Sequence, residues 1–148
     1  MAKPNYHRSF DDIERSDLVP GVTARPMWGE KIMMSIIEIS PNAIVPEHAH
    51  PHEQAGMVIY GEFEFTIGGV AKTIKQGDAY IIPGNVPHAL VNGPGLSVAL
   101  DLFSPPREGY QKAEAKLEDK FIVKKGAKKP AVKKPAAGKK TTTRRAKN

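Results

Sequence analysis

Short runs of apolar or alternating residues follow one another through the middle of the chain, and Gly, Pro and Asn separate them. Many short strands at close spacing, with turn residues between them, are typical of an antiparallel sandwich or a small barrel. The pattern therefore predicts an all-β domain. The expected strands cover residues 22–28, 31–39, 43–48, 55–60, 62–67, 70–74, 79–83, 86–92 and 96–103.

The run EFEFTI shows the strand period most clearly. Phe63, Phe65 and Ile67 alternate with polar residues. Successive side chains of a strand point to opposite faces, so this run predicts a half-buried strand. Gly68-Gly69 follows at once and predicts a tight hairpin to the next run.

The segments on either side have a different texture. Residues 1–20 are polar, and we expect an N-terminal extension with one short helix around residues 11–16. The β domain is expected to span residues 21–123. It would end in an exposed helix at 111–120 and a last strand or edge at 121–123.

The net charge of +6 hides two oppositely charged parts. Eleven of the 22 basic residues, and none of the 16 acidic ones, lie in residues 124–148, so residues 1–123 carry a net charge of −5. The tail at 124–148 consists mainly of Lys, Ala, Pro and Thr. It cannot bury enough apolar surface to offset its ordering entropy and is predicted to be disordered.

This basic tail resembles the C-terminal tails of linker histones. Such a tail binds phosphate backbones by counterion release, without reading the sequence and with a steep salt dependence. It has no aromatic residue, so base stacking is not expected. Non-specific nucleic-acid contact is one prediction for the tail. The alternatives are a solubilising extension and a tail that folds back onto the acidic domain.

Several classes are excluded by composition. Without cysteine there is no disulfide framework, no zinc finger and no thiolate catalysis. No apolar run approaches the ~18 residues that a membrane span needs. The N-terminal sequence MAKPNYHRSFDD lacks the apolar core of a secretory signal. We therefore expect a cytoplasmic protein without membrane contact.

Four of the five histidines occur in two short segments. His48, His50 and His52 lie in PEHAHPHEQ, and His88 lies in IPGNVPH after two turn-forming prolines. Imidazole is a common ligand of Zn, Ni, Cu and Fe(II). Because residues i and i+2 of a strand face the same side, His48 and His50 can converge on one ion, and Gln54 shares their parity. The combined pattern predicts a metal site.

The two segments resemble the two sequence motifs of the cupins. Residues 48–61 read HAHPHEQAGMVIYG, and residues 77–92 read GDAYIIPGNVPHALVN. Two positions depart from the motifs. Gln54 stands where most cupins have Glu, and Asn85 stands where they have Gly.

The cupin resemblance covers roughly residues 22–104. It implies a double-stranded β-barrel, or jelly roll, that holds a divalent transition metal, and many cupins form homodimers. Ni, Zn, Mn and Fe all suit three imidazoles and an amide, so the metal is not identified. The implied ligands are His48, His50, Gln54 and His88. An early strand with Met27 and Trp28 is the expected dimer face.

A narrower resemblance is carried by HPHEQAGMVIYGEFEFTIGG and LDLFSPPREGY, which are similar to the pectin-degradation cupins of the KdgF type. Those proteins open the ring of 4,5-unsaturated monouronates to a linear 4-deoxy-5-keto uronate, and they use Gln as the fourth ligand. The resemblance implies that Asp101, Phe103 and Arg107 are catalytic residues around a small anionic sugar substrate.

The residue types suit this chemistry. Neutral imidazoles and a neutral amide leave the charge of a dication uncompensated, so the site attracts an anion. Asp101 can move a proton, Arg107 can pair with a substrate carboxylate, and Phe103 can stack on the sugar. The alternatives are that Asp101 pairs with a barrel cation and that Arg107 is a solvated loop residue. Asn92, Tyr60 and Tyr80 are expected to have structural, packing or rim roles.

Two other functions stay open at this point. One is a non-catalytic cupin sensor that holds a small anionic ligand while its tail contacts nucleic acid. The other is an Fe(II) cupin dioxygenase, which the neutral Gln54 ligand disfavours. Asp101 and Arg107 inside the pocket would favour the uronate enzyme over the sensor.

Overall fold

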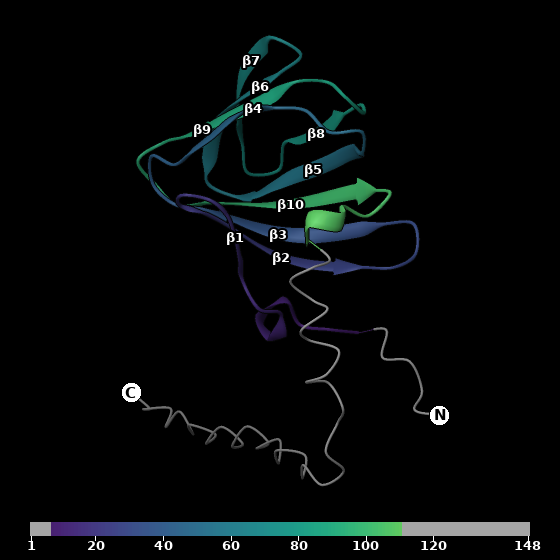
Figure 1. Cartoon of the computed structure of the whole chain (residues 1–148). Coiled ribbons are helices and arrows are strands. Elements are labelled where there is room, and N and C mark those ends of the chain that lie inside the picture. The colour runs from purple at the N-terminus through teal and green to yellow at the C-terminus, as the bar shows by residue number, and fades with distance from the viewer. Residues whose placement is uncertain (1–6, 111–148) are drawn as a thin grey trace, which may run out of the picture.

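The computed structural model describes residues 7–110 of the chain. These residues form two antiparallel sheets that enclose one core (Figure 1). The all-β, double-sheet architecture predicted from the strand pattern is confirmed. The helix expected at 111–120, the strand at 121–123 and the basic tail at 124–148 lie outside the described residues. No helix within the described part of the chain is long and apolar enough to cross a membrane.

Ten strands occur in the described residues. The first sheet has six strands, in the order β1 (Ser16–Val19), β2 (Val22–Trp28), β3 (Met33–Ile39), β10 (Ser97–Ser104), β5 (Glu53–Tyr60) and β8 (Ala79–Ile82). The second sheet has four, in the order β4 (Ile44–His48), β9 (His88–Asn92), β6 (Glu62–Ile67) and β7 (Val70–Lys75).

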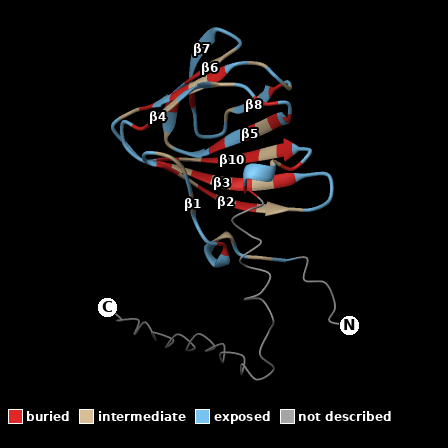
Figure 2. Cartoon of the chain, in the orientation of Figure 1, coloured by how far each residue is buried: buried red, intermediate tan, exposed pale blue. Residues whose placement is uncertain are grey.

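The core lies between the two sheets because the strands of each sheet alternate buried and partly exposed residues. β3 and β10 do so along their whole length (Figure 2). The inward residues of β10 are Ser97, Ala99, Asp101 and Phe103, each 8% exposed or less. In β6, Phe63 and Phe65 are buried as the EFEFTI pattern predicts, and Gly68-Gly69 links β6 to β7 as a hairpin. The sheet therefore carries a carboxylate on its inner face.

The N-terminal segment differs from the expectation of a helix at 11–16. A short 3-10 helix, η1, spans Phe10–Asp12, where the Ser9 hydroxyl accepts a hydrogen bond from the backbone N–H of Asp11. The chain is extended again at Ile13 and then forms β1, which pairs with β2. The pattern did not predict β1, because SDLV is short and half polar. It lies within residues 1–20, which were expected to form an extension.

Two residues of the cupin-like motifs, Asn92 and Gly61, lie where separate segments of the chain meet. The Asn92 side chain donates to the carbonyl of Ser40 at 2.8 Å, and its Oδ1 accepts from the Ser97 hydroxyl at 2.8 Å. Gly61 has a φ of 78°, and a Cβ there would lie 2.6 Å from the carbonyl oxygen of Leu96. The structural role expected of Asn92 is confirmed.

Met27 and Trp28 end β2 and are both half-buried. Met27 lies on the outer face of the first sheet, whereas Trp28 packs against the core. A dimer interface at these residues stays a prediction.

Candidate metal centre and its cavity

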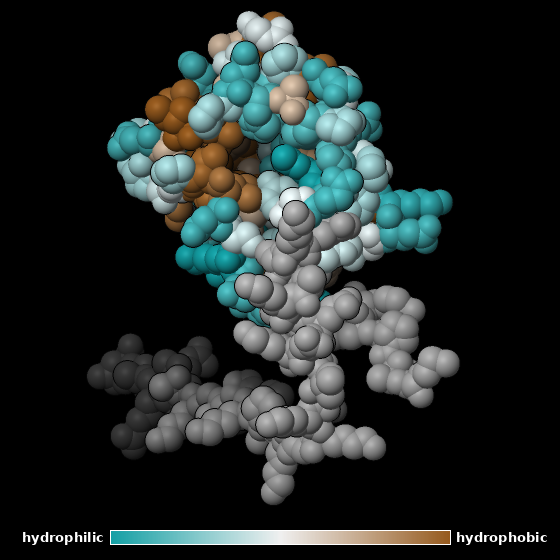
Figure 3. All heavy atoms as spheres, viewed as in Figure 1, coloured by the Kyte–Doolittle hydropathy of each residue, from teal (hydrophilic) through white to brown (hydrophobic). Residues whose placement is uncertain are grey.

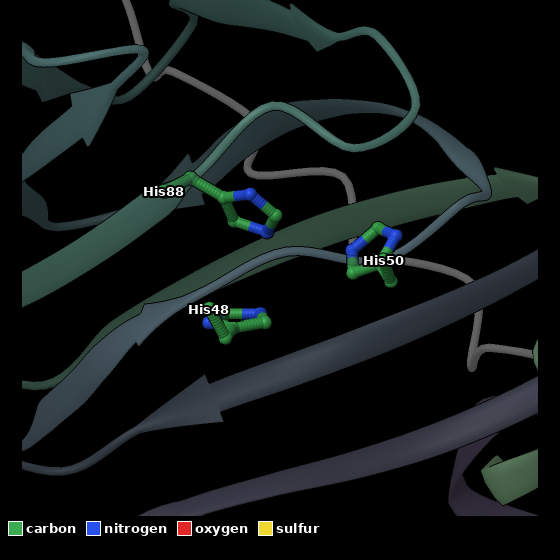
Figure 4. Close-up of side chains that lie close together, drawn as sticks. All are labelled: His48, His50 and His88. Carbon is green, nitrogen blue, oxygen red and sulfur yellow. The ribbon is translucent and has the colours of Figure 1, made fainter.

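Three histidines from two strands and one turn converge inside the barrel. His48 ends β4 and His88 begins β9, and the two are cross-strand partners. His50 reaches them from the turn after β4. The sequence predicted that His48 and His50 converge because they are two residues apart on a strand, and they do converge although the strand ends at His48. One ring nitrogen from each histidine lies within 4.8 Å of the other two (Figure 4).

The Nδ1 atom of each histidine faces a nearby main-chain carbonyl. A neutral imidazole that donates its Nδ1–H to a carbonyl has its lone pair at Nε2, the form that binds a metal. The chain itself therefore supplies the partners that orient the rings. The contacts are His48 to Pro46 at 2.9 Å, His88 to Val86 at 2.8 Å and His50 to His52 at 3.1 Å.

The hydrogen bonds of the ring nitrogens of His88 and His50 are incomplete, and a bound cation would complete their contacts. Nε2 of His88 is buried and has no hydrogen-bond partner within the described part of the chain. Both nitrogens of His50 face oxygens, since its Nε2 lies 3.2 Å from Oε1 of Gln54 and its Nδ1 faces the carbonyl of His52. A neutral imidazole has one N–H, so one of these two contacts lacks a proton.

Protonation of His50 does not supply the missing proton at neutral pH. Burial, with the positive charge of Arg107 and the neighbouring His88, lowers the pKa of His50 to about 4. Burial also lowers the pKa of His88. A lowered pKa keeps an imidazole deprotonated, which metal coordination requires. The three-histidine cluster can hold a metal ion.

Gln54 lies at the start of β5, between the histidine cluster and Asp101. Its side chain is buried, with Oε1 toward His50 and a hydrogen bond toward the carboxyl of Asp101. The hydrogen bond to a carboxylate requires the amide NH₂, which leaves Oε1 as the atom directed at the cluster.

Asp101 and Tyr80 meet across a glycine. Gly56 of β5 pairs with Asp101 of β10 on one side and with Tyr80 of β8 on the other. The Tyr80 hydroxyl donates to Oδ1 of Asp101 at 2.5 Å. A Cβ at Gly56 would lie 2.4 Å from the Tyr80 ring, so only glycine lets the ring cross the strand to reach the carboxyl.

Burial is the main influence on both groups. It raises the pKa of Asp101 to about 6, although hydrogen bonds from Tyr80 and Gln54 and the charge of Arg107 act in the opposite direction. Burial and the adjacent Asp101 raise the pKa of Tyr80, so the phenol keeps its proton and remains a donor. A carboxyl with a pKa near 6 has both protonation states accessible around neutrality.

We expect Gly56→Ala to separate Tyr80 from Asp101 and to destabilise the fold. The new methyl group overlaps a buried ring, and overpacking of this kind costs about 1–3 kcal/mol. Thermal denaturation of the variant measures the cost. Gly29→Ala is the matched control, because a Cβ at Gly29 would meet no atom of the described residues within 4 Å. Equal melting temperatures for the two variants would contradict this account of Gly56.

Arg107 follows β10 and lies over two aromatic rings. Its Cζ is 5.3 Å from the ring centroid of Phe103 and 5.1 Å from that of Tyr110, distances at which the cation is attracted to the ring faces. The Phe103 ring is 2% exposed and lies 5.8 Å from the ring of His50. The guanidinium is thereby held near the cluster.

These groups border a single cavity of about 620 Å³. Figure 3 shows its opening as a hollow with hydrophobic atoms along one side and hydrophilic atoms along the other. All but one of the predicted site residues line it, and the exception, His50, has its ring 5.0 Å from that of His88. The predicted residues that line the cavity are His48, Gln54, His88, Asp101, Phe103 and Arg107.

Among the cavity residues that were not predicted from the sequence, Tyr80, Tyr110 and His52 have contacts with the predicted site or beside it. Tyr80 was expected to pack or lie at a rim, but it is the partner of Asp101. Tyr110 supports Arg107. His52 is buried beside Glu108 and lies outside the three-histidine cluster. Its Nδ1 has no hydrogen-bond partner among the residues that the structure describes. The only sequence signal for Tyr80 was its parity with the buried Ile82 in an otherwise apolar run.

Comparisons with known proteins agree with this geometry. Residues 35–100 match the family model for the cupin domain. The chain is 36% identical over 102 residues to the pectin degradation protein KdgF of Dickeya dadantii (strain 3937), across 68% of this chain and 93% of that protein.

Two solved structures show the same fold. An RmlC-like cupin from Shewanella frigidimarina NCIMB 400 has a TM-score of 0.67 at 29% identity, covering 74% of this chain and 99% of that one. KdgF from Halomonas sp. has a TM-score of 0.63 at 27% identity, covering 68% and 93% of the two chains. With the double sheet, the converging histidines and these similarities together, the chain belongs to the cupin family.

Proposed function

We propose that this protein is a metal-dependent cupin enzyme that opens the ring of 4,5-unsaturated monouronates to linear 4-deoxy-5-keto uronates. The observation that carries the proposal is the hydrogen-bonded pair of Asp101 and Tyr80 in the same cavity as the histidine cluster. Similarity to KdgF over most of both chains supports the substrate class. The inward positions of Asp101 and Arg107 favour an enzyme over a sensor.

We propose His48, His50, His88 and Gln54 as the residues that would hold a divalent transition metal, one of Ni, Zn, Mn or Fe. When bound, such an ion supplies Lewis-acid polarisation of a substrate oxygen. All four ligand side chains would be neutral, so they would leave the positive charge of the bound ion uncompensated. The site would therefore favour an anionic ligand.

Asp101 is the proposed proton carrier. Ring opening is a net isomerisation: the bond between the anomeric carbon and the ring oxygen breaks, the anomeric hydroxyl loses a proton, and C4 gains one as the enol becomes the 5-ketone. One group that takes a proton and returns it is therefore sufficient. Asp101, with a pKa near 6, can do both, and the Tyr80 hydroxyl fixes its orientation.

The proposal is tested by adding the purified, metal-loaded protein to unsaturated galacturonate and following the loss of the ultraviolet absorbance of the conjugated enol ether. We expect rapid loss, which stops when a chelator removes the metal and returns when the metal is restored. A rate equal to that in buffer would contradict the proposed function.

Arg107 is the proposed anchor of the substrate carboxylate, so Arg107→Gln should raise KM more than it lowers kcat. A hydrogen bond to a charged group contributes about 1.5–3 kcal/mol, which corresponds to roughly a 10- to 100-fold rise in KM. Initial rates against substrate concentration measure this split. Arg15→Gln is the control, since the exposed Arg15 pairs with Glu38 and does not line the cavity. A fall in kcat alone would contradict the anchoring role.

A further inference from the structure

The cavity continues past the polar groups into a region lined by aliphatic side chains. Five strands contribute inward-facing residues to it, and none of these side chains has a polar atom. We call this region the apolar chamber. It is lined by Val22, Ile37, Ile39, Val45, Leu90 and Ala99.

Strand register places the chamber directly beside the candidate metal centre. In the first sheet, Asp101 lies one inward position from Ala99, which pairs with Ile37. In the second sheet, His88 lies one inward position from Leu90, which pairs with Val45. Two residues along a strand span about 7 Å, so the polar and apolar layers are about 7 Å apart in both sheets.

The chamber residues belong to the core or pack against it, and they also line the cavity. Leu18 and Val19 of β1 and Pro46 of β4 also line the cavity, and all three are partly or fully exposed. Water in such a space finds few hydrogen-bond partners, because ordered water needs two to four polar groups. A hydrocarbon group that displaced this water would be bound favourably.

Charge fixes how a ligand would lie across the two regions. Arg107 lies over Phe103, whose ring is 5.8 Å from that of His50, so it is on the histidine side of the cavity. Asp17 lies at the chamber end, because it pairs with Thr23, which is next to Val22. Two other exposed carboxylates that line the cavity, Glu47 and Glu108, are the chain neighbours of His48 and Arg107. Arg107 is the one Lys or Arg among the described residues that line the cavity, so it is the side chain to which a ligand carboxylate is attracted.

We propose that this cavity binds small carboxylates that carry a hydrocarbon group, with the carboxylate at Arg107 and the hydrocarbon in the apolar chamber. The inference rests on the proposed function only for the position of the carboxylate. The inference goes beyond the proposed function because it names a different ligand. A sugar acid bears oxygen on nearly every carbon, so it would leave the aliphatic walls without an apolar partner. The chamber therefore sets a second ligand class for the same site, competing with the uronate.

Isothermal titration calorimetry with butyrate, hexanoate and octanoate tests the proposal on the full-length, metal-loaded protein. Each buried methylene contributes about 0.8 kcal/mol, so we expect Kd to fall about fourfold per added methylene until the chamber is full. Kd values that do not change with chain length would overturn the proposal. Hexanamide, which lacks the negative charge, should bind more weakly than hexanoate. Equal Kd values for the two would overturn the proposed contact between the ligand carboxylate and Arg107.

A matched pair of isosteric variants locates the hydrocarbon. Val45→Thr places a hydroxyl in the chamber and should weaken hexanoate by at least about fivefold, because the hydroxyl loses water without gaining a partner. Val91→Thr makes the same change on β9, at a side chain that is 46% exposed and does not line the cavity, and should leave Kd unchanged. Equal effects of the two variants would overturn the assignment.

The two proposals fail in different ways. If chain-length dependence holds but unsaturated galacturonate is not converted, the apolar chamber stands and the uronate reaction falls. If galacturonate is converted but the acids bind with equal Kd, the reaction stands and the second ligand class falls. Arg107→Gln should weaken every acid by a similar factor and leave the fold-change per methylene intact.

Discussion

Replacing His88 with alanine is expected to abolish stoichiometric metal binding and, with it, ring opening. His88 supplies a buried Nε2 that has no hydrogen-bond partner among residues 7–110, and it is the one cluster member that comes from β9. Loss of a residue that merely supports a metal ligand lowers affinity by about 10- to 100-fold, so loss of a ligand should exceed 100-fold. Metal content by inductively coupled plasma mass spectrometry and affinity by chelator competition measure the effect.

His7→Ala is the control for this result. His7 is exposed and does not line the cavity, so the variant removes a histidine without changing the cluster. We expect wild-type metal content from it. One equivalent of tightly bound metal in His88→Ala would show that the three-histidine cluster is not the metal site.

Asp101→Asn should lower kcat/KM by about 10²- to 10⁴-fold, the usual contribution of a positioned acid or base. The amide has nearly the same shape and can still accept a hydrogen bond from Tyr80, but it cannot carry a proton between substrate atoms. Metal content should stay at the wild-type level, because Asp101 is not in the histidine cluster. Steady-state kinetics and metal analysis on the same preparation separate the two properties.

Asp12→Asn removes a carboxylate from the exposed η1 segment and serves as the control for charge. It should retain full activity. If Asp101→Asn lowered kcat/KM by only about threefold, the loss would be far smaller than expected for a proton carrier. Asp101 would then have no role in the reaction.

Much of the fold follows from local patterns. Period-two alternation and the Gly and Pro turns predict β2 to β10, because each signal is contained within a few neighbouring residues. β1 escaped because its four residues carry no clear alternation, and its place in the sheet comes from pairing with β2. Local patterning thus predicts the strands whose residues alternate clearly between apolar and polar. It misses β1, whose place in the sheet depends on its pairing with β2.

The candidate site divides along similar lines. The histidines and Gln54 are visible in the sequence because one short motif and one turn-flanked His88 carry them. The Asp101–Tyr80 pair is not visible, because it depends on the register of β5 against both β8 and β10. Nothing local to Tyr80 shows that a glycine 24 positions earlier will open space for its ring.

The amide of Asn92 has a consequence for the metal centre. It ties the end of β9 to the Ser40 carbonyl that precedes β4, and so opposes any sliding of these two strands past each other. A slip by one residue would turn every side chain of a strand to its other face, and the His48–His88 pair would be lost. Asn92 thus helps to keep the three-histidine cluster together, although it lies about 14 Å from His88 along the strand, at 3.4 Å per residue.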